Sequence, residues 1–174
     1  GNSFLIDKMY IIDGENIKDF YVYIENNEKK EKIFDNIVAV SGTKKEAIRT
    51  ISRLCAKQTM LDATQLEEAF WKREEWDSTG CGEGIAIPHA IIKEIDEVQL
   101  FIVRFRYPIE WESFDDKKVD IAFAIIAPEE KGQEKYLVFL SRLARKLVDE
   151  KFIADFRNCR STEAVYQYVK NELE

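Results

Sequence analysis

The fold of this chain is read most directly from the stretch Ser78-Thr79-Gly80-Cys81-Gly82-Glu83-Gly84-Ile85-Ala86-Ile87-Pro88-His89. Three glycines at alternate positions let the backbone adopt positive φ angles and bring its N–H groups close to a ligand, and the two hydroxyl side chains before them add donors. Ile85-Ala86-Ile87 favours a β-strand, and Pro88 biases the residue before it toward an extended conformation. We therefore predict an anion-binding loop, formed by Ser78, Thr79, Gly80, Gly82 and Gly84, followed by a stiff strand that presents His89.

Two ordinary explanations compete with this functional one. Glycine-rich stretches are usually turns, and a lone histidine beside apolar residues is more often structural than nucleophilic. Two common phosphate loops are excluded, because no Gly-Lys-Ser/Thr follows and because the glycines lack the dinucleotide spacing and precede a strand-like segment. Spacing alone leaves the structural and the functional interpretations open.

The rest of the chain alternates between helical and β patterns. Capping boxes at Thr43-x-x-Glu46 and Thr64-x-x-Glu67 predict two helices before the glycine-rich stretch. Val98–Phe105 and Val119–Ile126 are apolar, β-branched and aromatic, which predicts central strands. Further helical stripes follow, the last of them capped by Ser161. This alternation predicts an α/β fold, a three-layer sandwich with a mixed central β-sheet flanked by helices.

The first 34 residues carry no motif and are predicted to form an amino-terminal extension, packed on or leading into the domain over residues 35–174. Phe4–Ile12 is β-like, and Ile17, Phe20, Tyr21 and Ile24 have helical spacing, which predicts a packed helix. The start Gly1-Asn2-Ser3 lacks an initiator methionine, so we expect a segment cut from a longer protein.

Composition narrows the classes of partner. The formal net charge is −7, which argues against direct binding to nucleic acid or to an anionic membrane, since both need a basic face. No apolar run approaches the roughly 20 residues of a membrane helix, and there is no signal peptide, so a cytoplasmic location is predicted. Cys55, Cys81 and Cys159 are widely spaced, which fits neither a disulfide framework nor a zinc site. We expect free thiols, no metal and no cofactor.

The same stretch resembles a known family, the IIA component of the bacterial phosphotransferase system of the fructose/mannitol type, which includes the nitrogen-regulatory IIA proteins. In that family an Arg-Glu pair precedes a Ser-Thr-Gly-x-Gly-x-Gly-Ile-Ala-x-Pro-His run, as Arg73-Glu74 do here. Weaker similarity extends over roughly residues 37–169. The resemblance implies that His89 accepts a phosphoryl group from the phosphocarrier protein HPr and passes it to a cysteine of a IIB domain. It makes the chain a phosphotransferase component acting through a phosphohistidine, with Arg73 supplying charge to the phosphoryl group.

One position departs from the family pattern. Members usually carry a second histidine at the start of the helix that follows the proline-terminated strand, and Tyr136 occupies that position here. A phenol can donate a hydrogen bond to a phosphoryl oxygen, but its pKa of about 10 prevents it from sharing a proton near neutral pH as imidazole does. Two functions therefore stay open: a working phosphoryl carrier of sugar transport, or a IIA-like sensory domain of a transcription regulator or antiterminator, phosphorylated on His89.

Overall fold

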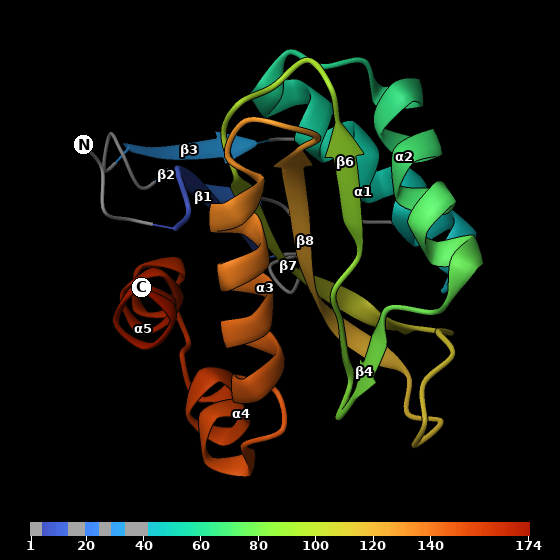
Figure 1. The fold of residues 1–174 in the computed structure, drawn as a ribbon. Helices are drawn as coiled ribbons and strands as arrows, with labels where there is room; N and C mark the ends of the chain where they lie inside the picture. Colours follow the sequence, from blue (N-terminus) through green and yellow to red (C-terminus); the bar gives the residue numbers. More distant parts are fainter. Residues whose placement is uncertain (1–4, 14–19, 25–28, 34–41) are drawn as a thin grey trace.

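The structure is a computed structural model, and it describes residues 5–13, 20–24, 29–33 and 42–174. Figure 1 shows a β-sheet between two groups of helices. The strands are β1 (Lys8–Asp13), β2 (Phe20–Ile24), β3 (Lys29–Ile33), β4 (Gly80–Gly82), β5 (Ile85–Ala86), β6 (His89–Ile92), β7 (Gln99–Ile109) and β8 (Val119–Pro128). The helices are α1 (Lys44–Thr59), α2 (Ala63–Trp76), α3 (Gln133–Lys146), α4 (Glu150–Arg157) and α5 (Thr162–Leu173).

The sheet is mixed, and β7 and β8 form its centre. Its strand order is β3-β2-β1-β7-β8-β5-β4, with β6 also paired to β8. β7 and β8 are antiparallel, whereas β1 runs parallel to β7, and both β5 and β6 run parallel to β8. Almost every residue of β8 is buried, as expected for a strand covered on both faces. The predicted three-layer α/β sandwich with a mixed sheet is confirmed.

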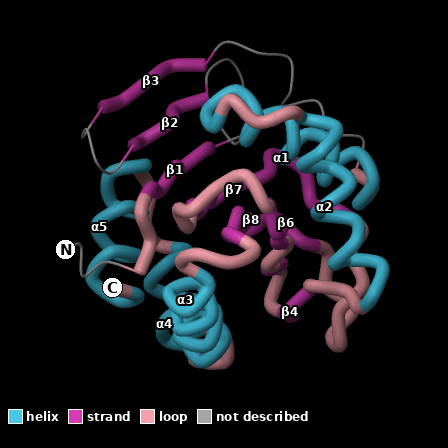
Figure 2. Tube along the Cα trace, turned by 45° about the horizontal axis from the view of Figure 1, so that its top comes forward, coloured by secondary structure: helices cyan, strands magenta, loops and turns pink. Residues whose placement is uncertain are grey.

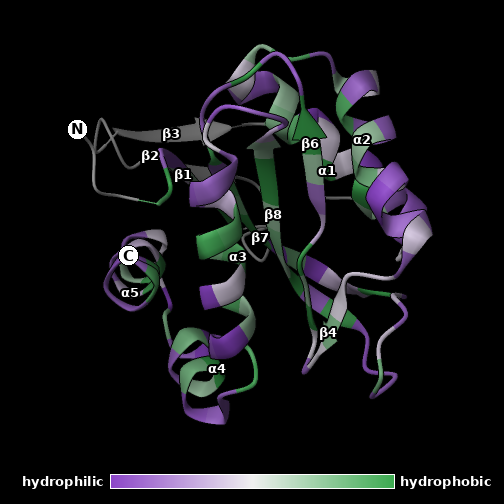
Figure 3. Cartoon of the chain, viewed as in Figure 1, coloured by the Kyte–Doolittle hydropathy of each residue, from purple (hydrophilic) through white to green (hydrophobic). Residues whose placement is uncertain are grey.

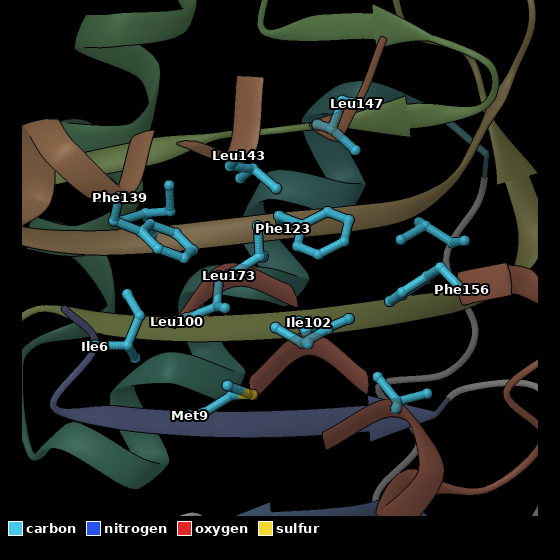
Figure 4. Close-up of a cluster of buried hydrophobic side chains, with 14 of the residues drawn as sticks. Ile6, Met9, Leu100, Ile102, Phe123, Phe139, Leu143, Leu147, Phe156 and Leu173 are labelled. Carbon is cyan, nitrogen blue, oxygen red and sulfur yellow. The ribbon is translucent and has the colours of Figure 1, made fainter. Parts of the chain in front are cut away.

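One face of the sheet is covered by α3, α4 and α5. Figure 4 shows this layer, in which Phe139 and Leu143 of α3 and Phe156 of α4 meet Phe123 of β8. The phenyl rings of Phe123 and Phe156 have centroids 5.3 Å apart and are tilted, a favourable aromatic geometry. The second face is covered by α1 and α2, as Figure 2 shows from above.

Helix starts agree with the sequence in two cases and differ in one. Thr43 caps α1 by accepting the Glu46 N–H, and Ser161 caps α5 by accepting the Ala164 N–H. The predicted cap at Thr64 is wrong, because Asp62 accepts the Gln65 N–H and α2 begins at Ala63. A carboxylate is as good an N-cap as a hydroxyl, so the chain uses the earlier residue.

The amino-terminal segment is not helical where the structure describes it. Phe20, Tyr21 and Ile24 lie in β2, which pairs with β1, so the predicted helix is wrong there, and Ile17 lies outside the described residues. β1 confirms the β-like pattern and contributes Met9, Ile11 and Ile12 to the buried core. Pairing of β2 with β1, which itself pairs with β7, decides the conformation of this segment, since strand pairing overrides a weak local helical pattern.

Figure 3 shows the resulting hydropathy pattern, with apolar residues along β8 and polar ones on the outer side of α2. Within the described part of the chain, no helix combines the length and the apolar character that crossing a membrane requires.

Candidate phosphoryl-acceptor site

His89 stands at a break in a strand. Ile85 pairs with Ile121 and His89 with Ile125, so β5 and β6 follow β8 in one unbroken register. Between them Pro88 cannot donate to a ladder, although its carbonyl accepts the Ile125 N–H at 2.9 Å. The break is therefore local, and the backbone before and after His89 is fixed by pairing with β8.

The imidazole of His89 is held in one tautomer. Nδ1 lies 2.9 Å from the carbonyl oxygen of Ile87. A carbonyl oxygen only accepts, so Nδ1 carries the proton and Nε2 keeps a free lone pair. Burial lowers the pKa of His89 from its ordinary 6.5, with the Arg73 charge acting in the same direction and the Ile87 carbonyl and Glu74 acting against it. The lowered pKa favours the neutral imidazole at neutral pH.

Two further predicted residues approach this imidazole. The ring of Tyr136, from the first turn of α3, has its centroid 6.1 Å from that of His89, and the two planes are inclined by 52°. Burial raises the pKa of Tyr136, and Arg73 acts on it in the opposite direction. The Arg73 charge thus acts on the pKa of both rings.

Arg73 lies in the last turn of α2, which packs beside β6 (Figure 1). Its Nη1 donates to the Asp77 carbonyl at 2.6 Å, and its guanidinium carbon is 5.2 Å from the ring centroid of Trp76. Trp76 is 81% exposed, so it is a surface residue and not the packing residue its type suggests. Arg73 and Trp76 line an open groove of about 590 Å³ between α2 and β6.

The residue after Arg73, Glu74, is a buried carboxylate that accepts several hydrogen bonds. Glu74 is only 4% exposed, and it accepts hydrogen bonds from Lys44 Nζ, Thr79 N and Trp111 Nε1 at 2.9 Å each. Its other oxygen accepts from the Thr79 hydroxyl at 2.6 Å. Four donors from three other parts of the chain therefore converge on one buried carboxylate.

The glycine-rich stretch forms a β-hairpin whose two ends have different surroundings. Thr79 lies at the near end, where its carbonyl accepts the Ile87 N–H at 3.0 Å, and Gly80 pairs with Ala86. The hydroxyl of Ser78 donates to the Glu112 carbonyl at 2.6 Å, and that of Thr79 donates to Glu74. Both hydroxyl hydrogens are thus donated to protein acceptors.

Gly82 and Gly84 lie at the far end of the hairpin. Gly84 is five residues before His89 along the β5–β6 line, a separation of about 16 Å at the usual strand rise. Both glycines have positive φ, and a Cβ would meet the ring of Phe114 at Gly82 and the Arg157 guanidinium at Gly84. The phosphate-binding role of Gly82 and Gly84 stays a prediction, and the close packing of the turn gives both glycines a structural role.

Two hydrogen-bonding groups of the site, the Glu74 carboxylate and the Ile87 carbonyl, were not predicted from the sequence. Glu74 appeared only as part of an Arg-Glu pair, yet Leu66, Phe70 and Glu74 recur at every fourth position and all three are buried. A carboxylate on an apolar helix stripe signals a buried partner set. The Ile87 carbonyl left no signal, because any residue supplies one.

Cys55, Cys81 and Cys159 carry free thiols, and burial raises the pKa of the Cys81 thiol to about 11. In the part of the chain that the structure covers, no three His, Cys, Asp or Glu side chains are grouped to hold a metal ion.

Fold and site together define a IIA-type domain of a phosphotransferase system. The chain belongs to the family described as phosphoenolpyruvate-dependent sugar phosphotransferase system, EIIA 2, whose sequence model matches residues 26–172. It is 36% identical over 129 residues to the nitrogen regulatory protein of Escherichia coli (strain K12), covering 73% of this chain and 78% of that protein. The nitrogen regulatory protein of Bradyrhizobium diazoefficiens is 32% identical over 125 residues, covering 72% and 81%.

Solved structures show the same architecture. The nitrogen regulatory protein IIA-Ntr from Neisseria meningitidis superposes with a TM-score of 0.67 at 28% identity, covering 74% of this chain and 87% of that one. Enzyme IIAMTL of Escherichia coli, solved in complex with phosphorylated enzyme IIBMTL, superposes with a TM-score of 0.58 at 20% identity, covering 75% and 89%, and supports the fold.

Proposed function

We propose that His89 is a phosphoryl acceptor that takes its phosphoryl group from HPr. The observation that carries this proposal is the hydrogen bond from Nδ1 to the Ile87 carbonyl, which leaves Nε2 as the nucleophilic atom. Nε2 attacks phosphorus, a new N–P bond forms, and the bond from phosphorus to the donor atom of HPr breaks. No proton has to leave Nε2, so the reaction depends on positioning and on charge stabilisation.

Arg73 and Tyr136 are the side chains that stabilise the transferred group in this proposal. A guanidinium can bind two phosphoryl oxygens at once, and Arg73 needs only to exchange the Asp77 carbonyl for them. The phenol of Tyr136 donates one further hydrogen bond from the opposite helix. Of the hairpin residues, Thr79 hydrogen-bonds the backbone of Ile87, and the Ser78 hydroxyl accepts the Gly80 N–H, so in this proposal they fix the backbone beside Ile87.

Two destinations for the phosphoryl group are proposed. Transfer to a cysteine of a IIB domain is supported by the fold shared with IIAMTL, which forms a complex with phosphorylated IIBMTL. A regulatory use, as a cytoplasmic sensory domain, is supported by the relatives at 36% and 32% identity, which are nitrogen regulatory proteins. The chain contains a single histidine, so Tyr136 replaces any second imidazole, and this favours a stable signal over rapid onward transfer.

Intact-mass measurement after incubation with phosphoenolpyruvate, enzyme I and HPr tests the acceptor. We expect one acid-labile, base-stable phosphate on the wild-type protein and none on His89→Ala. Cys81→Ser is the matched control, because its thiol lies in the same hairpin, and this variant should be labelled like wild type. Label that survives in His89→Ala would assign the acceptor to another residue.

A chase experiment separates the two destinations. Phosphorylated protein is mixed with purified IIB domains of the fructose and mannitol type, and loss of the phosphate is followed over minutes. Rapid discharge supports the carrier. A phosphate that persists while HPr alone can remove it supports the regulatory domain.

A further inference from the structure

We infer that Glu74 is a positioning residue for phosphoryl acceptance by His89. It does not touch the imidazole, and it acts through the backbone of the glycine-rich hairpin. The inference rests on the proposed function, since it explains how the acceptor nitrogen is aimed.

A continuous series of hydrogen bonds joins Glu74 to the imidazole. The Thr79 N–H and hydroxyl both donate to the Glu74 carboxylate, at 2.9 and 2.6 Å. The carbonyl of Thr79 accepts the Ile87 N–H at 3.0 Å. The carbonyl of Ile87 in turn receives Nδ1–H of His89 at 2.9 Å. Each step fixes the next residue, so the orientation of the ring depends on where the carboxylate lies.

The carboxylate is itself held by two further donors. Lys44, at the first position of α1, contributes an ammonium whose side chain is 14% exposed, and Trp111, after β7, contributes its indole N–H. Lys44 also contacts Glu112, whose carbonyl accepts the Ser78 hydroxyl. Because α1, α2 and the segment after β7 all converge here, the Glu74 carboxylate is a fixed point and not a mobile surface charge.

The charge of Glu74 has a second effect on the acceptor. Among the charged groups that act on His89, Glu74 raises its pKa and Arg73 lowers it. Replacing Glu74 by Gln keeps the shape and allows several of the hydrogen bonds but removes the negative charge and turns one acceptor into a donor. A positioning role therefore predicts changes at an imidazole that Glu74 does not contact.

The test compares wild type with Glu74→Gln and with Asp120→Asn. Asp120 is the matched control because it accepts two hydrogen bonds from Arg157 at 2.9 Å at the far end of the same hairpin. Ring ¹⁵N shifts give the tautomer of His89, its pH titration gives the pKa, and phosphorylation by HPr gives kcat and KM. We expect wild type and Asp120→Asn to keep a proton on Nδ1. Glu74→Gln should lose this single tautomer, titrate at lower pH and lose roughly ten- to a hundred-fold in kcat with little change in KM.

The outcomes separate this inference from the proposed function. A folded Glu74→Gln protein with the wild-type tautomer, titration and kcat overturns the positioning role. Wild-type protein that HPr does not phosphorylate overturns the proposed function, while the ring measurements still decide whether Glu74 positions His89. If Glu74→Gln does not fold, Thr79→Val is used instead, because it removes the hydrogen bond from the Thr79 hydroxyl and leaves the carboxylate in place. A wild-type His89 tautomer in that variant overturns the inference. A mixture of His89 tautomers supports it.

Discussion

The imidazole of His89 faces the phenol ring of Tyr136, with ring centroids 6.1 Å apart and planes inclined by 52°. The two rings come from β6 and from α3, so the site spans the edge of the sheet and the first turn of a covering helix. Tyr136 thus lies beside His89 at the position where the family pattern has a second histidine.

Tyr136→Phe removes only the hydroxyl and tests whether the phenol donates to the phosphoryl group. A hydrogen bond to a charged acceptor is worth about 1.5 to 3 kcal/mol, so equilibrium phosphorylation against a fixed pool of phosphorylated HPr should fall roughly ten-fold or more. Intact-mass occupancy at several donor ratios measures this. Occupancy equal to wild type would show that Tyr136 fills volume and gives the phosphoryl group no hydrogen bond.

Arg73→Ala should slow phosphorylation by about 100-fold, because it removes a charged donor that acts most strongly as the phosphoryl group arrives. The fold should hold, because Arg73 is only half-buried at the end of a helix. Its hydrogen bond to the backbone carbonyl of Asp77 is exposed to solvent, so losing it should cost little stability. Initial rates from quenched time courses provide the measurement. Arg73→Lys keeps the charge but cannot bind two phosphoryl oxygens at once, so its phosphorylation rate should lie between those of wild type and Arg73→Ala. Equal rates in all three proteins would make Arg73 an ordinary helix-end cation.

The histidine also predicts a pH dependence of stability. Burial lowers the pKa of His89 below 6.5, so in the window below 6.5 the unfolded chain binds a proton that the folded chain does not. The contribution of the neutral imidazole is fully present above that window and is lost as the pH falls through it. The free energy of unfolding, measured in urea from pH 8 to pH 5, should therefore decline more for wild type than for His89→Gln. Parallel curves would contradict the lowered pKa.

Gly80→Ala separates a structural from a phosphate-binding role of the hairpin. An alanine Cβ at this position would lie 2.3 Å from the backbone oxygen of Glu112, so we expect a loss of about 1 to 3 kcal/mol in unfolding free energy. Cys81→Ala, one residue on, should cost less. The folded fraction of Gly80→Ala should still accept phosphate, because no contact of Gly80 to the phosphoryl group is needed. Wild-type stability with abolished phosphorylation would restore Gly80 as a phosphate ligand.

Local sequence patterns predicted individual helices and strands better than they predicted how the strands pair. The buried β7 and β8 and the caps at Thr43 and Ser161 follow from residue type and short spacing. Phe20–Ile24 was predicted as helix because its apolar spacing fits one, and only the pairing of β2 with β1 makes it a strand. Such pairing joins residues distant in sequence, and periodicity carries no information about it.

The candidate site likewise has parts that the sequence predicts and parts that it does not. The roles of His89 and Arg73 are predicted from motif and resemblance, and that of Tyr136 from its departure from the family pattern. The hydrogen-bonding environment could not be predicted, because the Ile87 carbonyl and the convergence of Lys44 and Trp111 on Glu74 arise from three-dimensional proximity. The role of the glycines stays a prediction for a related reason: a positive φ serves a tight turn as well as a ligand, and residue type does not distinguish the two.

The unbroken register of β5 and β6 along β8 makes the site sensitive to chain length as well as to residue type. Ala90 and Ile92 point to the α1–α2 face, so His89 points to the face of α3. Deleting or inserting one residue between Ala86 and His89 would exchange these faces and turn the imidazole toward α2, away from Tyr136. We therefore expect homologous chains that have one residue more or one residue fewer between these two positions to have lost the acceptor, even where the rest of the motif is kept. The length of this interval can thus be used to separate active from inactive members of the family.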